Sequence, residues 1–146
     1  MLIIYGGSDT LVILKSLSTL TSTEKCNAKV FLIVRKPVTS ISGIANFPWL
    51  SPTQALLDWY KSNEKKEGSW DLYCKIFRKE LLSTEKQVGL AMIENLSKGS
   101  KDVILLCYCK DKEHCHRSLI YEALVNRGVE CICESVSYTH LRAHET

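Results

Sequence analysis

Three short apolar segments constrain the fold of this chain more than any other feature of its sequence. They are residues 28–36 (AKVFLIVRK), 101–109 (KDVILLCYC) and 129–134 (VECICE), and their apolar residues occupy nearly consecutive positions. A strand with this pattern is buried on both faces, as strands are in a parallel sheet covered by helices. A fourth apolar run, residues 2–8 (LIIYGGS), is stopped by two glycines and also predicts a strand.

Segments with helical periodicity separate these runs. A first helix is expected over residues 8–20, where leucines recur at helical spacing: Leu11, Leu14, Leu17 and Leu20. Four further helices are expected over residues 51–62, 68–83, 83–100 and 116–128. Ser51 is the expected N-cap of the second helix, with Pro52 at its first helical position. Residues 36–50 contain two prolines and a glycine and predict a long loop.

This alternation of strands and helices predicts one α/β domain. Its sheet should be largely parallel, with helices on both faces, which gives three layers. A chain of 146 residues is the size of a single domain. We assign this domain to residues 1–135.

Charge and cysteine content limit the classes of function. The formal net charge of +3 permits an anionic ligand but lacks the concentrated basic face of a dedicated nucleic-acid binder. No apolar run approaches the roughly 18 residues that cross a membrane, and the N-terminus has no secretory signal pattern. The seven cysteines are therefore expected to stay reduced in the cytoplasm. No feature of the sequence indicates an oligomeric state.

The last residues are expected to lie outside the domain. Residues 136–146 (VSYTHLRAHET) show no periodicity and resemble adaptor-derived read-through. The alternative is a genuine polar tail. In both cases we leave His140 and His144 out of any site.

Functional side chains are expected at the carboxyl edge of the sheet, where open α/β sheets bind their ligands. Three segments end there: YGGS with Ser8, RKPVTS with Arg35 and Ser40, and CYCKDKEHCHRS. The last segment runs from a strand into a helix and carries Cys107, Cys115, His116, Arg117 and Ser118. We expect Arg35, Cys107 and Arg117 to approach one another at this edge.

The same segments resemble a known family. IYGGS, VRKP, WLSPTQALLDWYK, SWDLYCKIFRKELL and LLCYCKDKEHCHRSLIYEAL occur in the order seen in the bacterial and phage family catalogued as domain of unknown function 488. The resemblance covers about residues 1–133 and implies a Rossmann-like fold. Two positions depart from the usual family pattern: Ile33 replaces an aspartate, and Cys109 replaces an acidic residue.

Three chemistries fit the cysteine and histidine loop. A zinc site would use Cys107, Cys109, Cys115 and His116, although their spacing is not a standard one. A reactive thiol is favoured at Cys115, because a helix N-terminus and Arg117 both stabilise a thiolate. An anion site would use the backbone N–H groups of residues 116–119 together with Arg117 and Ser118.

Packing alone is the simplest alternative. In that case Cys107 and Cys115 are small buried side chains, and Arg117 pairs with a carboxylate such as Asp58 or Glu122. Trp49, Trp59, Tyr60 and Trp70 can stack on bases, but aromatic residues at helical spacing more often belong to a core.

The sequence thus predicts an anion-binding edge, and an enzyme built on it would be a hydrolase or transferase acting on a phosphate-containing substrate such as a nucleotide. Arg35 and Arg117 would hold the anion, with Ser8, Ser40 and Ser118 as further ligand-binding residues. His116 would be the acid or base, and Cys107 or Cys115 the nucleophile. The alternatives are a non-enzymatic nucleotide or nucleic-acid binding module and a zinc or redox-thiol protein. The sequence indicates no cofactor.

Overall fold

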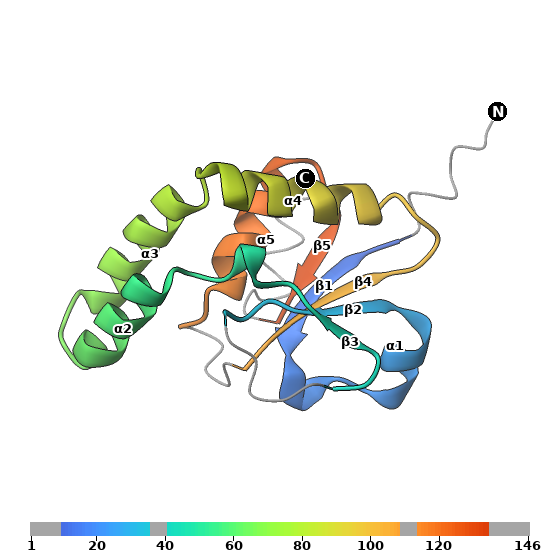
Figure 1. Cartoon of the computed structure of the whole chain (residues 1–146), viewed down its shortest axis with the longest axis horizontal. Coiled ribbons are helices and arrows are strands. Elements are labelled where there is room, and N and C mark those ends of the chain that lie inside the picture. The colour runs from blue at the N-terminus through green and yellow to red at the C-terminus, as the bar shows by residue number, and fades with distance from the viewer. Residues whose placement is uncertain (1–9, 36–40, 109–113, 135–146) are drawn as a thin grey trace.

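Five parallel strands form the centre of the structure, a computed structural model that describes residues 10–35, 41–108 and 114–134. They are β1 (Val12–Ser16), β2 (Lys29–Leu32), β3 (Ile44–Asn46), β4 (Val103–Cys107) and β5 (Cys131–Cys133). Their order in the sheet is β3-β2-β4-β1-β5, and each neighbouring pair runs parallel (Figure 1). The predicted parallel sheet is therefore confirmed.

Helices connect these strands. The 3-10 helices are η2 (Leu17–Thr19) and η3 (Pro48–Leu50). The α-helices are α1 (Ser22–Asn27), α2 (Gln54–Asn63), α3 (Ser69–Glu80), α4 (Thr84–Leu96) and α5 (Arg117–Asn126). Figure 1 shows α2 and α3 side by side at one end of the molecule. Gly68, with φ of 80°, takes the left-handed conformation that starts α3 after the turn from α2.

Alternate residues of the strands supply two apolar clusters on opposite faces of the sheet. In β4, all five residues are buried. Leu105 and Cys107 belong to the larger cluster, which includes residues of α2, α3, α4 and α5. Ile104 and Leu106 belong to the smaller cluster, against which Leu17 and Leu20 pack. The domain is therefore a Rossmann-like α/β fold with a helix-flanked sheet.

The prediction of a helix over residues 8–20 is wrong. Residues 12–16 form β1, which lies between β4 and β5 and alternates buried and half-buried side chains. The β-branched residues Val12 and Ile13 suit a strand. The leucines at helical spacing belong to different elements, because Leu14 lies in β1 and Leu17 begins η2. The strand predicted within residues 2–8 lies outside the described residues, as does the tail 136–146.

Two boundaries also differ from the prediction. Part of the predicted loop 36–50 forms β3, which pairs with β2. The N-cap of α2 is Thr53, whose hydroxyl accepts a hydrogen bond from the Leu56 N–H at 3.2 Å. Ser51 instead donates its hydroxyl to the Pro48 carbonyl oxygen. Because Thr53 is the N-cap, Pro52 lies before the helix and not at its first helical position.

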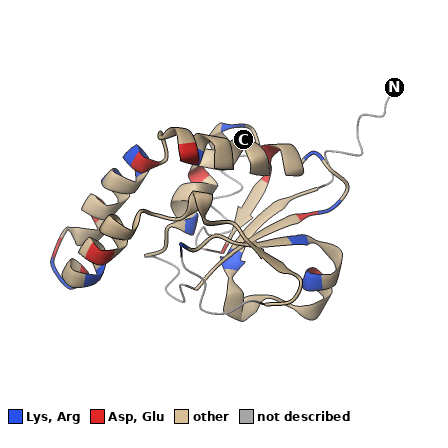
Figure 2. Ribbon diagram, in the orientation of Figure 1, with Lys and Arg blue, Asp and Glu red and all other residues tan. Residues whose placement is uncertain are grey.

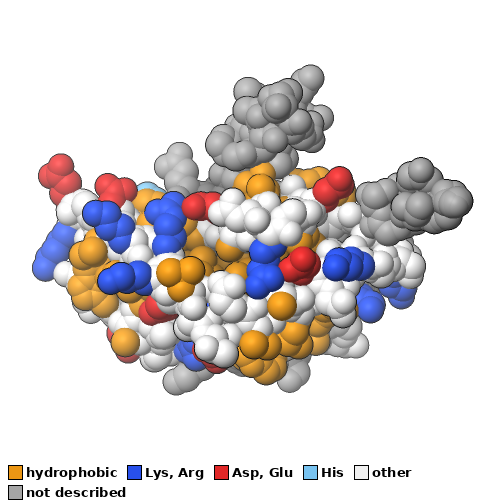
Figure 3. Space-filling view, turned by 90° about the horizontal axis from the view of Figure 1, so that it is seen from above, with side chains coloured by type: hydrophobic (Ala, Val, Ile, Leu, Met, Phe, Trp, Pro, Cys, Tyr) orange, Lys and Arg blue, Asp and Glu red, His pale blue; other side chains and the backbone are white. Residues whose placement is uncertain are grey.

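The surface of the described residues mixes charges of both signs. Figure 2 shows basic and acidic residues interspersed along α2, α3 and α4, and Figure 3 shows both among hydrophobic side chains on one face. None of the helices in the described ranges is long and apolar enough to cross a membrane.

Candidate functional site

A cavity of about 780 Å³ opens beside the carboxyl ends of β2 and β4. Arg35 follows β2 and Tyr108 follows β4, while Cys115 and His116 lie at the start of α5. Residues of α2 and α3 also line it. This size is within the range of sites that hold small organic ligands.

Two cysteine thiols meet at one end of this cavity. The Cys107 and Cys115 sulfurs lie 3.1 Å apart, and one thiol donates a hydrogen bond to the other. Cys107 ends β4 and is fully buried, whereas Cys115 is 1% exposed and lines the cavity. Cys115 is therefore the member of the pair that a bound ligand meets first.

His116 is oriented by a backbone carbonyl. Its Nε2 lies 3.1 Å from the carbonyl oxygen of Ile33, a residue that is 83 positions earlier in the sequence. Because a carbonyl can only accept, Nε2 carries the proton and donates it. Burial lowers the pKa of His116, assisted by the charge of Arg117, against the raising effects of Cys107 and the Ile33 bond. The ring is therefore neutral at pH 7, and its Nδ1 can accept a proton from the Cys115 thiol at 3.9 Å.

Arg117 is buried against the two thiols. Its side chain is 1% exposed, and its Nη1 donates to the Cys107 sulfur at 3.0 Å and to the Cys115 sulfur at 3.7 Å. Burial by itself lowers the pKa of Arg117, but charge on Cys107, Cys115 and Cys133 outweighs it, and the net direction is upward. A guanidinium in this position favours thiolates at both cysteines. We call Cys107, Cys115, His116 and Arg117 the thiol cluster.

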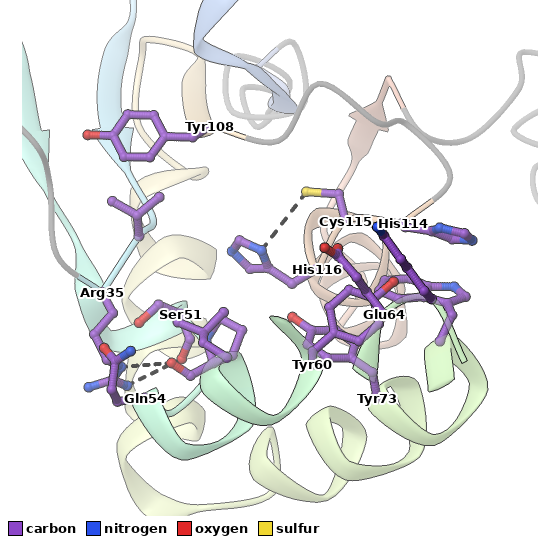
Figure 4. Close-up of a pocket in the computed structure, with 15 residues that line it drawn as sticks. Arg35, Ser51, Gln54, Tyr60, Glu64, Tyr73, Tyr108, His114, Cys115 and His116 are labelled. Atoms are coloured by element: carbon purple, nitrogen blue, oxygen red, sulfur yellow. Dashed lines mark hydrogen bonds between the residues drawn. The ribbon is translucent and has the colours of Figure 1, made fainter. Parts of the chain in front are cut away.

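Aromatic side chains form one wall of the cavity. The Trp70 and Tyr73 rings are stacked, with centroids 4.9 Å apart and planes 16° apart. The ring centroids of Tyr60 and Tyr73 are 5.0 Å apart, as are those of His114 and Trp70. In Figure 4, Tyr60, Tyr73 and His114 lie on the side of the cavity away from Arg35. We call Tyr60, Trp70 and Tyr73 the aromatic wall.

Two basic side chains, Arg35 and Lys65, are also part of the cavity lining. Arg35 donates from Nε to the Pro52 carbonyl at 2.7 Å and from Nη2 to the Ser51 carbonyl at 3.4 Å. These two bonds hold the guanidinium at the cavity lining. Lys65 and Glu64 also line the cavity, at the end of α2.

The structure brings together part of the residue set expected from sequence. Arg117 approaches Cys107 as expected, and Arg35 lines the same cavity as Cys115 and His116. The carboxylates named as alternative partners of Arg117 are engaged elsewhere: Glu122 pairs with Arg78, and Asp58 accepts from Gln54.

The remaining expected site residues are placed as follows. Ser118 donates both its hydroxyl and its N–H to the Cys115 carbonyl oxygen. Its role in anion binding stays a prediction. Ser8, Ser40 and Cys109 lie outside the described residues. Within residues 10–35, 41–108 and 114–134, no group of three His, Cys, Asp or Glu residues could hold a metal ion.

Sequence reasoning missed several residues of the site. Tyr73, Tyr108 and His114 line the cavity, and Cys133 contributes to the raised pKa of Arg117. The spacing of Trp70 and Tyr73, three residues apart on one helix, was a signal that they share a face. That this face lines a cavity follows only from the packing of α2 against α3.

Comparison with known proteins assigns the family. No curated protein and no solved structure matches the chain. A family model described as DUF488-N3a, the active DUF488-N3 subclade, matches residues 18–128. The match includes β2, β4, the start of α5 and the whole thiol cluster. Because it spans well over half of the chain, the chain belongs to the DUF488 family, in its DUF488-N3a subclade.

Proposed function

We propose that this protein is a cysteine-dependent hydrolase or transferase that acts on a phosphate-containing substrate of the nucleotide class. One observation carries the proposal: the Cys115 thiol lines the cavity with a neutral imidazole 3.9 Å and a guanidinium 3.7 Å from its sulfur. A base and a cation beside a thiol are what activate cysteine nucleophiles. The matching subclade is described as active, which supports an enzyme.

The reaction begins with formation of the Cys115 thiolate. His116 accepts the thiol proton at Nδ1, and Arg117 stabilises the negative charge left on sulfur. The sulfur then attacks an electrophilic atom of the substrate, and the leaving group departs with the electron pair of the bond that breaks. His116 returns the proton to the leaving group. Water (in a hydrolase) or an acceptor hydroxyl (in a transferase) then attacks the bound group, the bond to sulfur breaks, and the proton of the attacking molecule passes by way of His116 back to the Cys115 sulfur.

The cavity lining supports a nucleotide as substrate. The aromatic wall offers faces on which a base can stack, a contact worth about 1–3 kcal/mol per base. Arg35 and Lys65 supply positive charge for a phosphate, with Arg35 held in place by two backbone carbonyls. Arg117 is assigned to the thiols in this proposal, because its guanidinium donates to both sulfurs.

Turnover of a nucleotide panel tests the proposal. Nucleoside mono-, di- and triphosphates and dinucleotides are incubated with the full chain, and released phosphate and nucleoside products are measured. We expect turnover of at least one member, a loss of about 10³-fold or more in Cys115→Ser, and about a tenfold higher KM in Arg35→Gln. Cys26→Ser is the matched control, since Cys26 is exposed on α1.

Two results would contradict the proposal. Turnover that persists in Cys115→Ser would remove the nucleophile from the mechanism. Saturable binding of a nucleotide with no product from any panel member would make the protein a binding module.

A further inference from the structure

The two sulfurs of the thiol cluster are close to bonding distance. A disulfide needs a separation of about 2.05 Å, so the 3.1 Å between Cys107 and Cys115 leaves about 1 Å to close. Both residues are thiols in the structure; Cys107 is the last residue of β4, and Cys115 lies two residues before α5.

The surroundings favour oxidation of this pair over Cys131 and Cys26. Arg117 donates to both sulfurs, and a thiolate is the form of cysteine that oxidants attack. Cys131, by contrast, has its pKa raised to about 12, first by burial and then by Cys133 and Glu130. Cys26 is exposed on α1, which carries no part of the thiol cluster.

The access of an oxidant to each sulfur sets the order in which the two cysteines react. Cys115 lines the cavity, so a molecule as small as hydrogen peroxide can reach its sulfur. Cys107 is fully buried, and its sulfur lies 3.1 Å from that of Cys115. Cys115 therefore meets an oxidant first, and Cys107 is placed to react with the product.

We propose that Cys107 and Cys115 form a reversible disulfide on reaction with a hydroperoxide. The Cys115 thiolate attacks one peroxide oxygen, the O–O bond breaks, and the other oxygen leaves with the electron pair and is protonated to water or an alcohol. Cys107 sulfur then attacks the Cys115 sulfenic acid, the S–S bond forms, and the departing hydroxide takes the Cys107 proton as water. The two sulfurs together lose two electrons, which reduce the hydroperoxide, and a dithiol reductant restores both thiols.

The disulfide has a consequence for activity. Once bonded to Cys107, the Cys115 sulfur can no longer act as a nucleophile. This regulatory role rests on the proposed function, whereas formation of the disulfide does not. The two ideas can therefore fail separately.

Mapping of disulfides in the oxidised protein tests the inference without any substrate. The full reduced chain is treated with a stoichiometric amount of hydrogen peroxide, quenched with an alkylating reagent in denaturant, digested and analysed by mass spectrometry. We expect one main product, in which a Cys107–Cys115 disulfide joins the two peptides and dithiothreitol reverses it. In Cys107→Ser, Cys115 should stop at sulfenic acid, which dimedone traps; in the control Cys26→Ser, the disulfide should form as in the wild type.

Specific results would overturn the inference. They are alkylation of both Cys107 and Cys115 in the treated wild type, conversion of Cys115 to sulfinic acid while Cys107 stays alkylated, or a mixture of pairings that includes Cys26. Because these products are measured in the wild type, the test holds even where a variant fails to fold. Nucleotide turnover alongside any of them would leave the proposed function standing.

Discussion

Arg117 carries a charge that is almost entirely removed from solvent and is directed at two sulfurs. A buried cation needs compensation, and the Cys107 and Cys115 sulfurs, which accept hydrogen bonds from its guanidinium, are placed to supply it. The same arrangement makes the sulfurs reactive, so the stability of the guanidinium and the chemistry of the cysteines depend on one another.

Replacing Arg117 tests this dependence. In Arg117→Met the thiolate fraction of Cys115 at pH 7 should fall, and alkylation of Cys115 by iodoacetamide should slow about tenfold. Peptide mass spectrometry at timed quenches measures the rate. Arg78→Met is the control, because Arg78 is exposed and pairs with Glu122. An unchanged Cys115 rate in a folded Arg117→Met protein would show that the cation does not activate the thiol.

His116 should make stability depend on pH. Its pKa in the folded protein is lowered, chiefly by burial, so the unfolded chain binds the proton more readily. Stability is then fully present above the unfolded pKa of about 6.5 and decreases as the pH falls below it. We expect His116→Gln, which keeps a donor for the Ile33 carbonyl, to lose less free energy of unfolding between pH 7 and 5 than the wild type. Urea unfolding at both pH values measures this, and equal losses would contradict it.

At the scale of elements, β1 joins the edge strand β5 to the rest of the sheet, because it pairs with both β4 and β5. Val12 is fully buried, whereas Leu11 is only partly so. Val12→Ala should therefore reduce the free energy of unfolding by about 2 kcal/mol, and Leu11→Ala by less than half of that. A helix would give the opposite ranking, since its leucine stripe would include Leu11. Denaturant titration of both variants separates the two.

The elements that sequence predicted are those with a strong periodic or apolar signal. Helices α3, α4 and α5 and strands β2, β4 and β5 belong to this group. β3 was missed because it has three residues, two of them exposed, and is defined by its backbone pairing with β2. The carboxyl edge with Arg35 and Cys115 was predictable from strand direction. The aromatic wall was not, because it depends on the packing of α2 against α3.

At the scale of the whole molecule, the parallel sheet explains why one cavity collects so many chemical groups. Parallel strands end at the same edge, so residues that follow β2 and β4 meet there with the start of α5. The surface elsewhere mixes both signs of charge (Figure 2), which suits a small ligand held in a cavity better than an extended polyanion.

Protection of Cys115 from alkylation tests the central claim most directly, because it asks whether the thiol and the ligand share one cavity. The rate of iodoacetamide labelling at Cys115 is measured in the full chain with and without AMP, GMP, CMP and UMP, alongside Arg35→Gln and Cys26→Ser. We expect that at least one nucleotide slows labelling in the wild type and in Cys26→Ser, and that protection needs about tenfold more of that nucleotide in Arg35→Gln. Labelling of Cys115 at one rate, whatever the concentration of all four nucleotides, would contradict the claim.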